Sequence, residues 1–276
     1  MIVTISRGSY SRGKEVAEKL AQKLNYECVS REIVLEASTE FNIDEIKLVR
    51  ALHDAPLVLE RFLHGKERYL SYYRYALLKH MKKDNVIYHG LAGQFILRDI
   101  PHVLKVRIIA DMDDRVKEEM KRENISAKKA LYILKKDDEE RRKWGLQIHG
   151  KDTWDCRLYD LVLHISTLTV DDAVQILSDT VNKPHFQTTR KSQDILDSME
   201  KTAKIHSILA DVLPLARVSV DDGKVTVSNV GKSLKAESNV RERMEKAILD
   251  VDGIVSITIQ EQVNAKPTYI NPYHNI

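Results

Sequence analysis

The sequence has few cysteines, no long apolar run and almost no excess of either charge sign. Only Cys28 and Cys156 occur, which excludes a fold held together by several disulfides and is typical of a reducing compartment. No window of about 18 uninterrupted apolar residues exists, so we expect no membrane-spanning helix. Residues 1–7 lack the basic start and long apolar stretch of a secretory signal. These absences favour a cytoplasmic protein.

The charge balance argues against a nucleic-acid-binding protein. With 44 basic and 41 acidic residues the net charge is +3, which gives no bulk electrostatic reason to bind nucleic acid. Apolar residues make up 43% and charged residues 31% of the 276 positions, enough apolar content for a core and too much for intrinsic disorder. At roughly 100–200 residues per domain, this length predicts two domains.

The first 181 residues alternate short apolar segments with amphipathic ones. Period-2 or continuous apolar patterns predict strands, and apolar residues three or four positions apart predict helices. We expect strands at 2–6, 85–88, 102–110 and 161–165, and helices at 14–24, over most of 31–83, from 113 onward and at 170–181. This alternation favours a parallel sheet with helices on both faces.

The pattern of apolar and polar residues changes after residues 182–191. We interpret these residues as a linker because they contain Pro184 and are mostly polar. Residues 192–263 predict a small α+β domain, with Asp222 and Gly223 in a hairpin turn between two alternating strands. Its second helix is expected at 237–249 and its last strand at 254–259. Residues 264–276 are expected to form a surface tail.

The segment from Gly8 to Lys14 matches the pattern G-x-x-x-x-G-K. Glycines let backbone N–H groups surround an anion, the following helix adds its positive N-terminal end, and the lysine reaches the outer phosphates. Because the segment follows a predicted strand and opens a predicted helix, it predicts a phosphate-binding loop. The alternative is an ordinary strand-to-helix turn with an exposed lysine. Glu15 stands where such loops usually carry a Ser or Thr that binds Mg²⁺.

A series of segments in this order resembles the cytidylate-kinase-like P-loop proteins, relatives of the nucleoside monophosphate kinases. The matching segments are Ile5-Ser6-Arg7, Gly13-Lys14-Glu15, Ser30-Arg31-Glu32-Ile33, Val86-Ile87-Tyr88, Asp138-Glu139-Glu140-Arg141 and Tyr159-Asp160-Leu161-Val162. In that family a Glu commonly follows the basic residue of the loop, as Glu15 does here. The resemblance covers roughly residues 1–180 and implies a P-loop NTPase-type α/β fold, a parallel sheet flanked by helices.

The resemblance also implies roles for individual residues. As a nucleoside monophosphate kinase, the chain would hold ATP and Mg²⁺ and phosphorylate an acceptor such as CMP or dCMP. The residues implied to bind ATP are Gly8, Ser9, Tyr10, Ser11, Arg12, Gly13, Lys14 and Glu15. Arg115 and Arg141 would join Lys14 in stabilising the transferred phosphoryl group. Arg31 would meet the acceptor phosphate and Asp160 would orient one of the arginines. We assign no metal-ligating residue, and each arginine has the alternative of a solvated helix charge.

Departures from the family pattern keep a second hypothesis open. Tyr10 and Arg12 replace loop glycines, and His89-Gly90 stands where the family often has Gly-Arg. The chain would then be a weakly active or inactive nucleotide-binding sensor. We assign no catalytic role to two other clusters. The tyrosines at 69, 72, 73 and 75 are expected to be core or partner-facing residues. His149, Asp152, Asp155 and Cys156 lie close in sequence, but their spacing matches no zinc motif, so we expect no zinc site there.

The C-terminal domain resembles the BON domain, on residues 218–228, the predicted helix and residues 251–257. That module is associated with phospholipid or ligand binding and has no catalytic motif. The resemblance implies that this domain binds a partner protein or a lipid. In a third hypothesis the C-terminal domain is the functional part of the chain, and the N-terminal domain is only a scaffold. Whether the protein forms a homo-oligomer is left open.

Overall fold

The computed structural model describes residues 1–53, 63–230 and 238–260; for 50–53, 63–66 and 238 we describe only the backbone. The expected tail at 264–276 and the first residue of the helix expected at 237–249 lie outside these ranges. The chain divides into two compact units, residues 1–203 and 204–276. None of the described helices combines the length and apolar character needed to cross a membrane.

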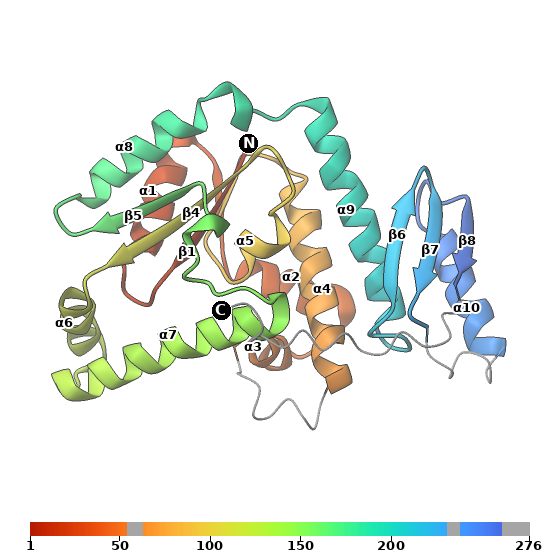
Figure 1. Ribbon diagram of the computed structural model, residues 1–276, viewed down its shortest axis with the longest axis horizontal. Coiled ribbons are helices and arrows are strands. Elements are labelled where there is room, and N and C mark those ends of the chain that lie inside the picture. Colours follow the sequence, from red (N-terminus) through yellow and green to blue (C-terminus); the bar gives the residue numbers. More distant parts are fainter. Residues whose placement is uncertain (54–62, 231–237, 261–276) are drawn as a thin grey trace, which may run out of the picture. The chain divides into compact units, whose positions relative to one another are not determined.

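The N-terminal unit is built on a five-stranded parallel sheet (Figure 1). Its strands are β1 (Ile2–Arg7), β2 (Glu27–Val29), β3 (Val86–Tyr88), β4 (Val103–Ala110) and β5 (Leu161–Ile165), in the order β2-β3-β1-β4-β5. The central strand β1 pairs with β3 on one side and β4 on the other. The chain therefore reverses its direction of winding at β1, and the carboxyl end of β1 is the place where such sheets form a crevice.

Helices cover both faces of this sheet. They are α1 (Gly13–Leu24), α2 (Glu32–Phe41), α3 (Glu45–His53), α4 (Leu63–Met81), α5 (Gly93–Ile96), α6 (Met112–Glu123), α7 (Ala127–His149) and α8 (Val170–Val181). The side chain of Ile2 packs with α2 and α4, while Val3 and Ile5 pack with α1 and α8. Burial on both faces explains the continuous apolar run in β1.

The structure differs from the sequence expectation at two places. β2 was not predicted, because only three residues form it and it pairs with β3 alone. The segment expected as a linker contains a 3-10 turn, η3 (Pro184–Phe186), whose Phe186 packs against the core beneath α1 and α8. Tyr72, Tyr73 and Tyr75 are buried in the core around α4, as predicted for that cluster.

The C-terminal unit has its own core and a three-stranded sheet. β6 (Arg217–Asp221) pairs antiparallel with β7 (Lys224–Ser228), and β7 pairs parallel with β8 (Ser256–Ile259). Asp222 and Gly223, at φ 45° and 73°, form the predicted hairpin turn. The end of α9 (Arg190–Leu209) and α10 (Ser238–Leu249) supply the apolar side chains that cover this sheet. This is a small α+β unit; its BON-like character remains a prediction.

Candidate active site

The loop between β1 and α1 is a tight turn with two left-handed residues. Tyr10 and Arg12 have φ of 58° and 60°, and turns with such residues can direct successive N–H groups to one side and bind anions. The Ser11 hydroxyl bonds the carbonyl oxygens of Gly8 (3.0 Å) and Ile108 (3.1 Å), which ties the loop to β4. A Cβ on Gly13 would lie 2.7 Å from the Cβ of Arg7, so only glycine lets α1 begin this close to β1.

Lys14 and Arg12 lie on the outer side of this loop. The Lys14 side chain is 64% exposed, and its ammonium lies 3.6 Å from Glu18, one turn further along α1. Arg12 is also exposed and lies 3.9 Å from Glu15 and from Glu118. Lys14 lines neither of the two cavities found beside the loop. In this conformation, therefore, the ammonium does not cover a phosphate site.

Helix α7 is docked onto the loop through buried polar contacts. The Arg115 guanidinium, from α6, donates to both carboxylate oxygens of Asp138 (2.8 and 2.9 Å) and to the Ser9 carbonyl (2.7 Å). The Ser9 hydroxyl bonds Asp137 at 3.1 Å. Because Arg115 is 7% exposed and all three contacts are made inside the protein, it holds the loop against α7 and is not directed at an open site.

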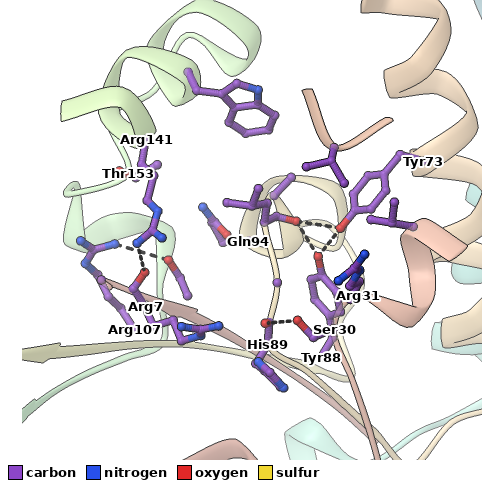
Figure 2. A pocket seen from close by; sticks show the side chains of 18 of the residues that line it. Arg7, Ser30, Arg31, Tyr73, Tyr88, His89, Gln94, Arg107, Arg141 and Thr153 are labelled. Carbon is purple, nitrogen blue, oxygen red and sulfur yellow. Dashed lines mark hydrogen bonds between the residues drawn. The ribbon is translucent and has the colours of Figure 1, made fainter. Parts of the chain in front are cut away.

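A cavity of about 630 Å³ opens at the carboxyl ends of the strands (Figure 2). Arg7, Arg107 and Arg141 line one side of it, and none of the three forms a salt bridge with a carboxylate of the described residues. Arg141 donates to the Arg7 carbonyl at 3.1 Å, and Arg107 reaches the hydroxyls of Ser6 and Tyr159 at 3.4 Å. Three guanidinium groups without a salt-bridge partner in the described part of the chain make this side of the cavity positively charged and suited to an anion.

Burial and the proximity of other guanidinium groups both act on the arginines at this site. Burial lowers the pKa of Arg7, and the nearby Arg141 lowers it further. The pKa of Arg141 is likewise lowered, first by burial, although Asp137 and Asp138 oppose that effect. Guanidinium groups remain charged at neutral pH in either case. Bringing a dianion between them would relieve the repulsion and replace the missing solvation.

The opposite side of the cavity is mostly apolar. Val34, Ile46, Val49 and Leu91 line it, together with Tyr73 from α4. Gln94, on α5, lies between this apolar side and the arginines (Figure 2). His89 also lines the cavity, but burial and the neighbouring Arg7 lower the pKa of its imidazole to about 4. It is therefore neutral at pH 7 and supplies no positive charge in place of an arginine.

The structure brings only some of the residues predicted from sequence into this cavity. Arg141 and Arg31 line it, although Arg31 is 74% exposed on its side chain and bonds Glu45 through Nε at 2.6 Å. Asp160 does not line it and forms no hydrogen bond or ion pair with an arginine in the described ranges. Its carboxylate instead accepts from the backbone N–H of Lys105 at 2.8 Å and lies 3.1 Å from the Lys105 ammonium.

Sequence reasoning assigned no role to Arg7, Arg107 or Gln94. Arg7 was noted only as part of a resembling segment. Arg107 carried a usable signal, because it is a charged residue inside an otherwise apolar strand, where burial is costly unless the charge has a purpose. Gln94 carried no signal, because nothing in its sequence neighbourhood distinguishes it from a surface glutamine.

A second cavity of about 530 Å³ lies on the other side of the loop. Tyr10, Arg12 and Glu15 line it from the loop and α1, and Ser166 and Thr169 line it from the segment after β5. The Arg122 guanidinium lies 5.5 Å from the centre of the Tyr10 ring and donates to its hydroxyl at 2.9 Å. The loop is thus flanked by one cavity on each side.

No group of three metal-binding side chains is found among the residues that the structure describes. The cluster at 149–156 is engaged elsewhere: His149 stacks on Phe95 at 4.2 Å, and Asp152 forms an ion pair with Arg142 at 2.6 Å. Ser9 and Asp137 beside the loop are oxygen donors of the kind that Mg²⁺ prefers. These residues fit a metal that is bound mainly through substrate phosphates and water.

A glycine-bounded loop that leads from the central strand of a parallel sheet into a helix defines the class of P-loop α/β proteins. A model of the cytidylate kinase-like family matches residues 2–167. The chain belongs to this family, and residues 168–276 lie beyond the matched region.

Individual relatives agree with the family. A cytidylate kinase of Sulfolobus acidocaldarius is 26% identical over 189 residues, which cover 68% of this chain and 98% of the relative. A cytidylate kinase of Pyrobaculum aerophilum is 30% identical over 115 residues, covering 41% and 62% of the two chains. The crystal structure of an uncharacterized protein from Eubacterium ventriosum has the same fold, with TM-score 0.51, 23% identity, and coverage of 66% of this chain and 99% of its own.

Proposed function

We propose that this protein transfers the γ-phosphoryl group of ATP to a nucleoside monophosphate, with CMP as the first candidate acceptor. The observation that carries the proposal is the set of three guanidinium groups at one side of the 630 Å³ cavity, next to the loop. The family membership and the cytidylate kinase relatives support it.

The acceptor monophosphate would lie between Arg7, Arg107 and Arg141. Planar guanidinium groups donate two parallel hydrogen bonds to phosphate oxygens and would hold the acceptor in one orientation. An oxygen of that phosphate then attacks the γ-phosphorus, the bond to the β,γ-bridging oxygen breaks, and ADP leaves. Phosphoryl transfer of this kind requires positioning and charge neutralisation rather than covalent catalysis by the protein.

The donor triphosphate would follow the loop from the second cavity toward the first. Backbone N–H groups at 8–13 and the N-terminal end of α1 provide the positive environment. Lys14 would have to leave Glu18 and turn over the loop, a rotation within reach of its flexible side chain. Mg²⁺, held by the phosphates with Asp137 and water, would neutralise charge on the transferred group.

Docking of α7 on the loop serves the exclusion of water. Asp138 and Arg141 lie three positions apart, on the same side of α7. Both line the acceptor cavity, and Asp138 also pairs with Arg115. When α7 closes over both substrates, water cannot compete with the acceptor for the phosphoryl group.

A panel of acceptors tests the proposal. The full chain with ATP and Mg²⁺ should form ADP only when a nucleoside monophosphate is present, and CMP should give the highest kcat/KM. Lys14→Ala should lower kcat by at least about 100-fold, because the ammonium contributes charge stabilisation in the transition state. Lys23→Ala, in the last turn of the same helix and exposed, is the matched control and should leave the rate unchanged.

The second candidate is a nucleotide-binding protein that does not transfer phosphate. The exposed position of Lys14 and the full engagement of Arg115 favour it. If ATP binds tightly and no member of the panel accepts phosphate, this candidate replaces the first. A third candidate, in which the C-terminal unit binds lipid or protein and the N-terminal unit is only a scaffold, requires that nucleotides bind nowhere on the chain.

A further inference from the structure

The carboxamide of Gln94 lines the 630 Å³ cavity and has no hydrogen-bond partner within the described part of the protein. The residue is 4% exposed, and its side chain makes no hydrogen bond to any residue in the described part of the chain. Figure 2 shows it in the open space between Arg141 and Tyr73, with no dashed line to a neighbour. A carboxamide that faces a cavity and has no protein partner is free to donate to and accept from a ligand bound there.

The support beneath Gln94 is rigid. Tyr88, at the end of β3, bonds the hydroxyl of Tyr73 and donates to the Leu91 carbonyl at 2.8 Å. Its ring fills the turn so closely that a Cβ on Gly90 would lie 2.0 Å from the Tyr88 hydroxyl. Ala92, at φ 65°, then reverses the chain into α5, where Gln94 is the second residue. The backbone that carries Gln94 is therefore held in place before a ligand arrives.

The chemistry around Gln94 selects among phosphate-bearing ligands. The arginines on one side would take the phosphate, and the apolar residues of α2 and α3 on the other side offer a surface for a flat apolar group. A carboxamide donates through its NH₂ and accepts through its oxygen. Cytosine presents an amino donor next to a ring-nitrogen acceptor, which matches both functions at once. A sugar phosphate without a base would leave the amide unpaired and the apolar side uncovered.

We propose that Gln94 is the residue that recognises the base of the acceptor nucleotide, through a pair of hydrogen bonds to its polar edge. This inference rests on the proposed function for the identity of the acceptor. It adds a selection for nucleotides over other phosphorylated compounds, which the three arginines cannot provide because they contact phosphate alone.

Binding measurements without ATP test the inference independently of catalysis. Calorimetry compares CMP with ribose 5-phosphate on the full chain and on Gln94→Met, which keeps the length of the side chain and removes its amide. The original chain should bind CMP at least about 100-fold more tightly than ribose 5-phosphate, and the substitution should weaken CMP binding by about 10- to 100-fold. Ribose 5-phosphate affinity should stay within about twofold, which also shows that the variant is folded.

The control and the contrary outcomes are distinct. Gln22→Met, at an exposed position of α1, should leave both affinities unchanged. Equal loss for both ligands, or a CMP preference that survives in Gln94→Met, overturns the role of Gln94. If the preference is lost as expected but ATP and CMP yield no ADP on the original chain, base recognition stands and the kinase proposal fails.

Discussion

Arg7, Arg107 and Arg141 line one cavity without a salt bridge to any carboxylate that the structure describes. Arg7 and Arg141 each have a lowered pKa because burial removes solvation and other guanidinium groups lie nearby. A protein retains such an arrangement at a cost in stability. Arg115 differs from these arginines because it forms a salt bridge with Asp138. We expect Arg115 to stabilise the fold and the three cavity arginines to bind a ligand.

Arg141→Gln and Arg107→Gln should each lower kcat/KM for the acceptor by about 100- to 1,000-fold, since each removes charge-assisted hydrogen bonds to phosphate. Steady-state kinetics with varied CMP at saturating ATP measures this. Arg157→Gln is the control, because Arg157 is 86% exposed on its side chain and pairs only with Asp155 two residues away. A change of less than threefold in both cavity variants would remove these arginines from the acceptor site.

His89 gives the stability a dependence on pH. Its pKa is lowered to about 4 by burial and by Arg7, against an ordinary value of 6.5, so the unfolded chain binds a proton that the folded chain refuses. The neutral His89 therefore makes its full contribution to the free energy of unfolding above about pH 6.5. That contribution is lost as the pH falls toward 4, because the unfolded chain takes up a proton there and the folded chain does not. His149 has a pKa lowered to about 4 for the same main reason, burial, and adds to the effect.

We therefore expect the free energy of unfolding to fall between pH 7 and pH 4.5, with about 2 kcal/mol of the fall due to His89. Urea denaturation at a series of pH values measures it. In His89→Gln the slope over this interval should be shallower by that amount. His185→Gln, at an exposed position, should keep the original slope; an unchanged slope in His89→Gln would show that the imidazole is already solvated.

Helix α7 illustrates how one element serves two purposes. Its residues 135–143 have a dense mixture of both charge signs, which on sequence grounds predicts an exposed helix with many salt bridges. Lys143 and Glu139 do form such a pair at 2.7 Å on the surface. Asp138 and Arg141 from the same run face inward, toward Arg115 and the acceptor cavity. Composition alone could not separate the two faces.

The Arg115 to Asp138 pair should behave as a buried ion pair. Asp138→Ala leaves the guanidinium without its partner and should cost about 3–5 kcal/mol in the free energy of unfolding. Glu139→Ala, its exposed neighbour, should cost less than about 0.5 kcal/mol. Denaturant titration compares the two variants with Arg115→Leu/Asp138→Leu, which removes both charges and should recover a large part of the loss.

At the scale of the whole molecule, the two units have separate cores. The family match ends at residue 167, within the unit that carries both cavities. The residues that line these two cavities all lie before residue 172. The C-terminal unit has its own sheet and an apolar cluster that includes Val225 and Ile248.

A chain that ends at Ala203 should keep the affinity for CMP within about twofold, because units with separate cores fold and bind largely independently. Calorimetry on the shortened and full chains measures this. Binding to phospholipid vesicles, predicted by the BON resemblance, should be lost in the same truncation. A large drop in CMP affinity would show that the C-terminal unit supports the acceptor site.

Prediction from sequence succeeded where structure is local. The apolar run at 2–5, the helical spacing at 14–24 and the turn at Asp222 and Gly223 depend on neighbouring residues, and each matches the structure. The three-residue β2 was missed because its identity as a strand comes from pairing with β3, more than fifty residues away. The assignments of Lys14 and Arg141 to catalysis are tested by the experiments above, and those of Arg115 and Arg31 remain predictions.

The amino-acid order by itself determined the alternation of strands and helices, the glycine-bounded loop and its place before a helix, because periodicity and backbone freedom are properties of short segments. Only the tertiary structure decided which charges face one another. Arg7, Arg107 and Arg141 stand on three different elements, and the folding of a parallel sheet brings their side chains to one cavity. The same packing places Gln94 at the cavity and leaves Lys14 in solvent, since burial depends on contacts between distant parts of the chain.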